Sequence, residues 1–144
     1  MDKRPRRAQC QARDWNRRRR PARLGQVYTM RTYPYPPDIE AEVTFVPTEQ
    51  GGRKTPAISG YRPQFYFGGF DFDADQEYPD VESVAPGQTA RTYLRFFSPD
   101  YIVGQVFAGM EFQIREGSRV VAHGRVTKIL HLEESAERAR STRR

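Results

Sequence analysis

The sequence has very few of the residues from which covalent crosslinks and metal sites are built. Its 144 residues include one cysteine, Cys10, and two histidines. A single cysteine excludes an intramolecular disulfide framework, and no Cys/His group has zinc-site spacing. No apolar run approaches the ~18 residues of a membrane span, and no apolar segment follows the basic start as in a secretory signal. We therefore expect one cytoplasmic domain with one modest core.

Positive charge is scarce in the body of the chain and concentrated at its start. The net charge is +6, but residues 1–37 hold one Lys and ten Arg against two Asp, a net of +9. Residues 38–130 hold nine basic and thirteen acidic side chains, a net of −4. Residues 131–144 hold four Arg against three Glu, a net of +1. The sequence thus predicts an acidic body with a basic arm, which is unusual for a folded face that grips a polyanion.

The basic arm, residues 1–23, has almost no large apolar side chains. Such a segment cannot offset its ordering entropy, so we expect it to be disordered when free. Its densest basic run is Arg17, Arg18, Arg19 and Arg20. Arginine binds phosphates bidentately and releases counterions, so this run is a candidate RNA-binding site. The alternatives are a solvated tail or an artefact of the gene start; an organelle transit peptide would need serine, and none precedes Ser59.

Beyond a proline-rich linker that ends at residue 37, apolar and polar residues alternate as in half-buried strands. The alternation and the turn signals predict six strands, at residues 39–45, 61–67, 81–84, 90–97, 110–115 and 119–130. Closure of these strands into a barrel would remove exposed edges. We expect residues 70–80 to form an acidic loop and residues 131–141 a solvated helix.

The expected organisation is therefore an all-β protein with a closed six-stranded antiparallel barrel and a short C-terminal helix. The domain boundaries follow as a basic arm and linker at 1–37, a barrel at 38–130 and a polar helical tail at 131–144. One parity of the strands places four phenylalanines in the core: Phe65, Phe67, Phe96 and Phe112. The opposite parity exposes three rings that are favoured in contacts: Tyr66, Tyr93 and Phe97.

No residue pattern points to catalysis or to a metal. Four carboxylates have the spacing of calcium-loop ligands: Asp71, Asp73, Asp75 and Glu82. However, Gln76 stands where such a loop needs glycine, which favours a solvated acidic loop. His123 and His131 are isolated, as structural or surface histidines are. We find no nucleophile–base pair, and we expect no enzyme, no cofactor and no metal.

Six short segments resemble consecutive segments of the third, C-terminal domain of translation elongation factor Tu. They occur in the same order and with similar spacing, at residues 39–43, 51–56, 60–67, 85–87, 112–117 and 124–130. The most distinctive is Tyr-Arg-Pro-Gln-Phe-Tyr-Phe at 61–67. The resemblance implies a six-stranded antiparallel barrel, in agreement with the alternation.

The family's GTP chemistry needs a glycine-rich loop that ends in Gly-Lys-Ser/Thr and cradles phosphates. This sequence has no such motif, and the stretch before residue 39 is too short for a GTPase domain and a second barrel. We therefore expect that the chain neither binds nor hydrolyses GTP.

In this family the third domain does no chemistry, and the resemblance implies contacts instead. It holds the acceptor and T-stem backbone of aminoacyl-tRNA, touches the GTPase domain and offers a surface to the exchange factor. Arg62 and Gln64 match the Arg and Gln that face tRNA, and Glu116 and Gly117 match a pair that approaches the T-stem through backbone and sugar. Glycine at this place allows a phosphate to come close.

The sequence also departs from the family near the expected RNA surface. An acidic run replaces an arginine and a threonine-rich loop there: Asp71, Asp73, Asp75 and Glu77. Lys54 replaces a histidine, and Ser98 replaces a lysine. Because carboxylates repel the phosphate backbone, two functions remain open. The chain is a binding module for tRNA or other RNA, or a protein-interaction module that engages the exchange factor or the GTPase domain without RNA. A fragment with no role of its own is a third alternative.

Overall fold

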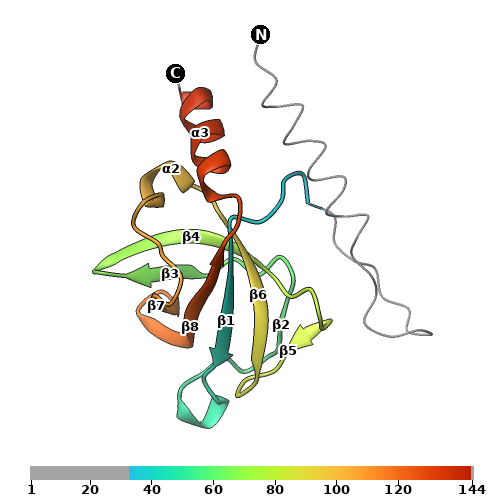
Figure 1. Ribbon diagram of the computed structural model, residues 1–144. Coiled ribbons are helices and arrows are strands. Elements are labelled where there is room, and N and C mark those ends of the chain that lie inside the picture. Colours follow the sequence, from blue (N-terminus) through green and yellow to red (C-terminus); the bar gives the residue numbers. More distant parts are fainter. Residues whose placement is uncertain (1–32, 144) are drawn as a thin grey trace, which may run out of the picture.

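The computed structural model describes residues 33–143, so the predicted site at Arg17–Arg20 lies outside the described residues. Six strands close into a barrel in the order β1–β6–β4–β3–β7–β8 (Figure 1). Every neighbouring pair is antiparallel. The six strands are β1 (Ile39–Phe45), β3 (Gln64–Phe67), β4 (Phe70–Glu77), β6 (Thr89–Phe96), β7 (Glu111–Glu116) and β8 (Arg119–Ile129). The prediction of a closed six-stranded antiparallel barrel is confirmed.

Strand β1 illustrates how the sequence pattern produces the barrel. Ile39, Ala41 and Val43 are 0% exposed and face the interior, while Glu42 and Thr44 face solvent. The strand pairs with β6 on one side and with β8 on the other, so neither of its edges is left open. Burial of the apolar side at about 25 cal/mol per Å² stabilises the closed sheet.

One strand of the barrel was missed, and another was wrongly assigned to it. The acidic segment predicted as a loop at 70–80 is largely strand β4, which pairs with β3 and β6. Its inward positions include Ala74 and Gln76, which are small or polar. The segment therefore lacks the alternation of large apolar and polar residues by which a strand is predicted. Gln76 is tolerated inside because its side-chain oxygen accepts a 2.7 Å hydrogen bond from the Tyr78 hydroxyl.

The segment predicted as a barrel strand at 81–84 does not enter the barrel. It contributes only β5 (Ser83–Val84), which pairs with β2 (Ala57–Ile58) in a separate two-stranded sheet. The strand expected at 61–67 is also shorter than predicted, because Tyr61 joins β4 only through an isolated bridge to Gln76. The count of six was therefore right, but the membership was not.

The barrel core is aromatic, as the parity of the strands predicts. The Phe65 ring lies 4.2 Å from that of Phe112 and 5.0 Å from that of Phe96, measured between centroids. Phe67 is only partly buried and stacks on Phe72 at 5.6 Å. Tyr93, expected to be exposed, is 6% exposed. The prediction failed there because the Arg91 side chain covers the tyrosine ring at 5.2 Å.

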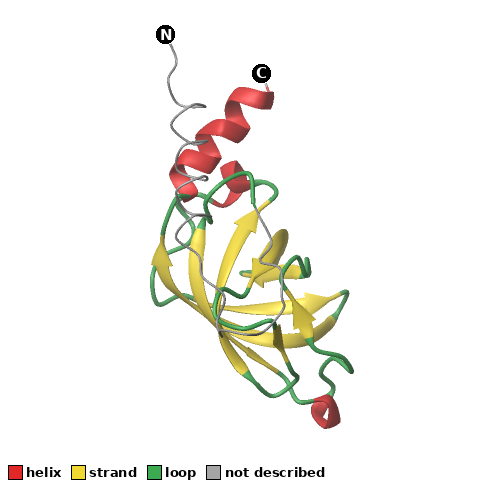
Figure 2. Cartoon of the chain, turned by 90° about the vertical axis from the view of Figure 1, so that its right-hand side faces the viewer, coloured by secondary structure: helices red, strands yellow, loops and turns green. Residues whose placement is uncertain are grey.

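Two helices cover one end of the barrel, opposite the 3₁₀ turn at Thr48–Gln50 (Figure 2). They are α2 (Pro99–Ile102) and α3 (Leu132–Arg143). The expected solvated helix is solvated on one side only, because Leu132, Ser135 and Ala136 are buried. The Ser135 hydroxyl donates to the Asp38 carboxylate, which also accepts from the Phe96 amide at 2.7 Å. Asp38, directly before β1, thus links the start of the barrel to α3.

Candidate RNA-binding face

The tight turn between β7 and β8 carries two of the predicted site residues. Glu116 is the last residue of β7, and Gly117 follows it in the left-handed conformation at a φ of 65°. A Cβ at Gly117 would meet no atom within 4 Å, and the residue is exposed. The turn therefore requires glycine for its backbone conformation, and it leaves the backbone open to a ligand.

The Glu116 carboxylate is the centre of a cluster that the sequence did not predict. Oε2 accepts hydrogen bonds from the Arg53 guanidinium and from the Tyr61 hydroxyl. Oε1 accepts a 3.1 Å hydrogen bond from Arg119. The Arg53 guanidinium also lies 4.3 Å from the centre of the Tyr61 ring. The only signals for this cluster were an arginine in the predicted loop at 47–56 and another directly after the turn.

The cluster fixes the charge state of Glu116. Partial burial acts to raise the pKa of Glu116, but the hydrogen bonds from Tyr61 and Arg53 outweigh it and leave the pKa below its ordinary value. Burial and the nearby Glu116 carboxylate raise the pKa of Tyr61. Glu116 is therefore ionised and Tyr61 neutral at physiological pH. Because its carboxylate is already paired with two arginines, Glu116 presents little free negative charge to a polyanion.

Arg62 and Gln64 belong to the segment that runs beside β7. Gln64 begins β3, and Arg62 lies two residues before it. Arg62 is exposed, and its guanidinium lies 4.3 Å from the centre of the Phe97 ring. Gln64 is paired in register with Arg115 on β7, the residue before Glu116. The structure thus brings Gln64 next to the Glu116–Gly117 turn. The Gln64 Oε1 atom is buried and accepts no hydrogen bond within residues 33–143, so the group of this side chain that can meet a ligand is the amide Nε2.

Arg115 was not predicted as a site residue, yet it joins these two groups. Its guanidinium lies 3.5 Å from the centre of the Tyr66 ring. Two of its nitrogens donate to Gln113 Oε1 at 2.8 and 3.0 Å. Held flat on a ring, the guanidinium loses less freedom on meeting a phosphate than a mobile side chain would. Tyr66 is half-buried beneath it, as expected for a ring on the outer face.

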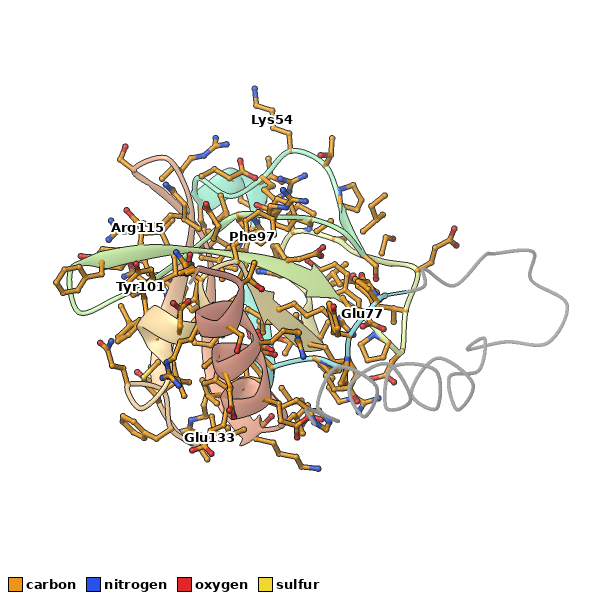
Figure 3. The ribbon with its side chains drawn as sticks, turned by 90° about the horizontal axis from the view of Figure 1, so that it is seen from above. Lys54, Glu77, Phe97, Tyr101, Arg115 and Glu133 are labelled. Carbon is orange, nitrogen blue, oxygen red and sulfur yellow. The ribbon has the colours of Figure 1, made fainter. Side chains whose placement is uncertain are left out.

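We give the name basic face to five cations: Arg115 and Arg119, which flank the turn in sequence, Arg53, which binds Glu116, Lys54, the residue after Arg53, and Arg62, two residues before Gln64. Lys54 projects away from the molecule, and Arg115 lies near its edge (Figure 3). Of the carboxylates, Glu116 is the one bound within this set. The acidic average of residues 38–130 thus conceals a local excess of positive charge.

Fewer carboxylates of the acidic run lie exposed beside the basic face than the sequence suggested. Asp73 is paired in register with Gln64, and Asp71 with Tyr66. Both aspartates are exposed. Glu77, by contrast, is 0% exposed and forms a 2.7 Å ion pair with Arg95. It therefore does not face a ligand approaching this side of the barrel.

The remaining candidate features are a metal site and a membrane-spanning helix. Within the described residues, no group of three or more His, Cys, Asp or Glu side chains could hold a metal ion. The calcium ligands considered above are split between β4 and the segment before β5, since Asp71 lies in β4 and Glu82 precedes β5. In the same part of the chain, no helix is long and apolar enough to cross a bilayer.

Fold and face together define a small closed antiparallel β-barrel with an outer surface of arginines and aromatic rings. The family model of the elongation factor Tu C-terminal domain matches residues 36–130. The match covers well over half of the 144 residues, and the chain belongs to this family. The resemblance inferred from the six short segments is confirmed, and it relates the chain to translation.

Proposed function

We propose that this chain is a non-catalytic cytoplasmic module that binds RNA, most specifically tRNA, through the basic face. The observation that carries the proposal is the arrangement around the β7–β8 turn. There, Arg53 and Arg119 neutralise the Glu116 carboxylate, Arg115 precedes it on β7, and the Gly117 backbone is open. Arginines positioned on rings and an exposed backbone amide are groups that bind phosphates.

The predicted residues take definite roles in this proposal. Arg62 and Arg115 contact phosphates, and Gly117 lets the sugar–phosphate backbone approach the turn. Gln64 donates a hydrogen bond from its side-chain amide to a ribose 2′-hydroxyl, a group that distinguishes RNA from DNA. Arg17–Arg20 add affinity through counterion release without sequence specificity. Each role is a contact, so the proposal requires no catalytic group, no metal and no GTP.

The test is the salt dependence of tRNA binding by the full chain, measured by fluorescence anisotropy. Each phosphate contact contributes about 0.9 to the slope of log K against log salt for a duplex. Arg62→Ala with Arg115→Ala removes the two arginines that are proposed to contact phosphates and should lower the slope by about 1 to 2. The matched control, Lys128→Ala with Arg140→Ala, removes two exposed cations elsewhere and should leave the slope nearly unchanged.

The arm is tested separately, with Arg17–Arg20 replaced by glutamine. This variant should bind tRNA more weakly at every salt concentration while keeping its sensitivity to the basic-face substitutions. The proposal fails if the unsubstituted chain shows no salt-dependent binding. It also fails if the control pair lowers the slope as much as the basic-face pair.

A second candidate function is supported by a different surface. Tyr101 and Phe107, on the segment between β6 and β7, are 60% and 61% exposed. Exposed aromatic rings are favoured anchors of protein interfaces. In this alternative the chain engages a partner of elongation factor Tu, either the exchange factor or the GTPase domain, without RNA. Calorimetry with each purified partner would detect it, and Tyr101→Ala with Phe107→Ala should abolish the heat of binding.

A further inference from the structure

The outer face of β4 carries three aspartates at alternate positions, and we call them the acidic face: Asp71, Asp73 and Asp75. Phe70, 64% exposed, has the opposite parity and points to the other side of the strand. Asp71 and Asp73 are exposed, and neither forms an ion pair within residues 33–143. Exposed carboxylates that form no ion pair are a surface that an arginine-rich segment fits.

Elsewhere in the described structure, arginine side chains pair with carboxylates and with aromatic rings. Within the described residues, seven arginines lie over aromatic rings, and the nearest is 3.5 Å from its ring centre. Several of these arginines also bind a carboxylate, as Arg91 does with Asp80 at 2.8 Å while covering Tyr93. Asp71 and Asp73 have no arginine partner within residues 33–143.

The chain itself supplies a segment of the required chemistry. Residues 1–23 hold nine Arg and one Lys against two Asp, a net charge of +8, together with Trp15. The described structure begins at Tyr33, whose ring lies 3.8 Å from the Arg95 guanidinium. Arg95 is paired in register with Asp75 of β4. The described part of the chain therefore begins beside Asp75, at one end of the acidic face.

The connection is long enough for the segment to fold back. Twelve residues lie between Arg20 and Tyr33, and a random coil of that length has an end-to-end distance of about 20 Å. The five residue steps from Asp75 to Phe70 along β4 span about 17 Å at the usual strand rise. A tether of this kind gives an effective concentration on the order of millimolar, so even weak contacts are occupied.

We propose that the Arg-rich segment 1–23 docks on the acidic face of the same chain. Its arginines pair with Asp71 and Asp73. The contact forms without RNA, so it does not depend on the function proposed above. Where RNA does bind, the acidic face competes with it for the same arginines and lowers the apparent affinity.

The single cysteine, Cys10, lies within this segment and provides the probe. A nitroxide attached to Cys10 broadens the amide resonances of residues that come near it. In ¹⁵N-labelled full-length protein at about 0.02 M salt, we expect selective broadening of residues 70–75. Raising the salt to about 0.5 M shortens the screening length and should remove most of the effect. Reduction of the nitroxide supplies the unbroadened reference.

Two variants separate this contact from non-specific attraction. Asp71→Asn with Asp73→Asn should abolish the broadening, whereas Glu49→Gln with Glu82→Gln changes the charge equally and should preserve it. The control carboxylates are both exposed and lie outside β4. If the double aspartate variant does not fold, the salt titration of the unsubstituted protein still decides the matter.

Three results would overturn the proposal. The first is no broadening, or broadening spread evenly over the barrel. The second is broadening confined to another face. The third is broadening that appears only when labelled and spin-labelled chains are mixed as separate molecules, because the segment would then dock on a second copy.

Discussion

The Tyr61 hydroxyl donates a hydrogen bond to the Glu116 carboxylate, although the two residues are 55 positions apart in the sequence. This contact ties the segment before β3 to the β7–β8 turn. It also keeps the carboxylate ionised and turned toward Arg53. The turn is therefore held in place by a polar cluster as well as by its backbone hydrogen bonds.

Tyr61→Phe should destabilise the protein by about 1 kcal/mol, because a hydrogen bond to a charged group is lost at a partly exposed site. It should also raise the pKa of Glu116 toward its ordinary value. A lowered pKa contributes stability above the unfolded value of 4.5, and that stability is lost as the pH falls through the folded value. The stability difference between the two proteins should therefore shrink as the pH falls below 4.5.

Urea denaturation across pH 3 to 7, with NMR titration of Glu116, measures both effects. Tyr66→Phe is the control, because the Tyr66 hydroxyl bonds no residue among those described. An equal loss of stability in the two variants would show that the Tyr61–Glu116 bond contributes nothing.

Gly124→Ala should destabilise the barrel by about 1 to 3 kcal/mol through overpacking. A Cβ at this position would lie 2.2 Å from Cζ of Phe112 and 2.5 Å from its Cε2. The ring cannot move aside easily, because Phe112 is 4% exposed and stacks on Phe65 at 4.2 Å. Thermal unfolding measures the effect, and Phe112→Leu in the same chain should recover part of the loss. A Gly124→Ala variant as stable as the parent would contradict the packing described here.

The free energy of unfolding of the protein, relative to that of the Asp38→Asn variant, should increase as the pH falls from about 6 to about 4. Burial raises the pKa of Asp38 from 3.8 to about 6, against the lowering effects of the Ser135 and Phe96 hydrogen bonds. The folded state thus binds a proton that the unfolded state releases, and this stability is lost as the pH rises through about 6. Between about pH 4 and pH 6 the difference should change by up to about 1.4 kcal/mol per pH unit.

The asparagine side chain can keep both hydrogen bonds, with its oxygen accepting from Phe96 and its amide donating to Ser135. Chemical denaturation from pH 4 to pH 8 gives the two stability curves. Parallel curves would mean that Asp38 titrates at its ordinary pKa in the folded protein.

Asp71→Asn with Asp73→Asn should strengthen tRNA binding about three- to tenfold at low salt. Two carboxylates that repel phosphate beside the basic face are removed, and the basic segment loses its competing site. Anisotropy with labelled tRNA measures the change, and Glu49→Gln with Glu82→Gln is the control for net charge. Unchanged or weaker binding would argue that RNA does not approach this side of β4.

The pattern of side chains predicted some elements well because their physics is local. In β1 the inward positions are all apolar, so alternation alone located the strand at residues 39–45. In β4 the inward positions include Ala74 and Gln76, and no pattern marked them as buried. Tyr93 was misplaced for a similar reason, since the cover over it is supplied by Arg91.

The candidate site divides in the same way. Gly117 was predictable, because a tight hairpin turn demands a residue that tolerates positive φ. The partners of Glu116 were not, because Arg53 and Tyr61 reach it from 63 and 55 positions away in the chain. Their proximity follows from the closure of the barrel, which no local pattern encodes.

By itself, the sequence determined the barrel class, the family and the separation of an arginine-rich arm from an acidic body. These follow from alternation, turn residues and charge, which are properties of neighbouring residues. Only the tertiary structure decided which six strands close the barrel and which charges meet. Glu77 became a buried partner of Arg95, Glu116 was neutralised, and Asp71 and Asp73 remained exposed. The reason is that burial and pairing depend on contacts between strands distant in sequence, and those contacts exist only once the sheet has closed.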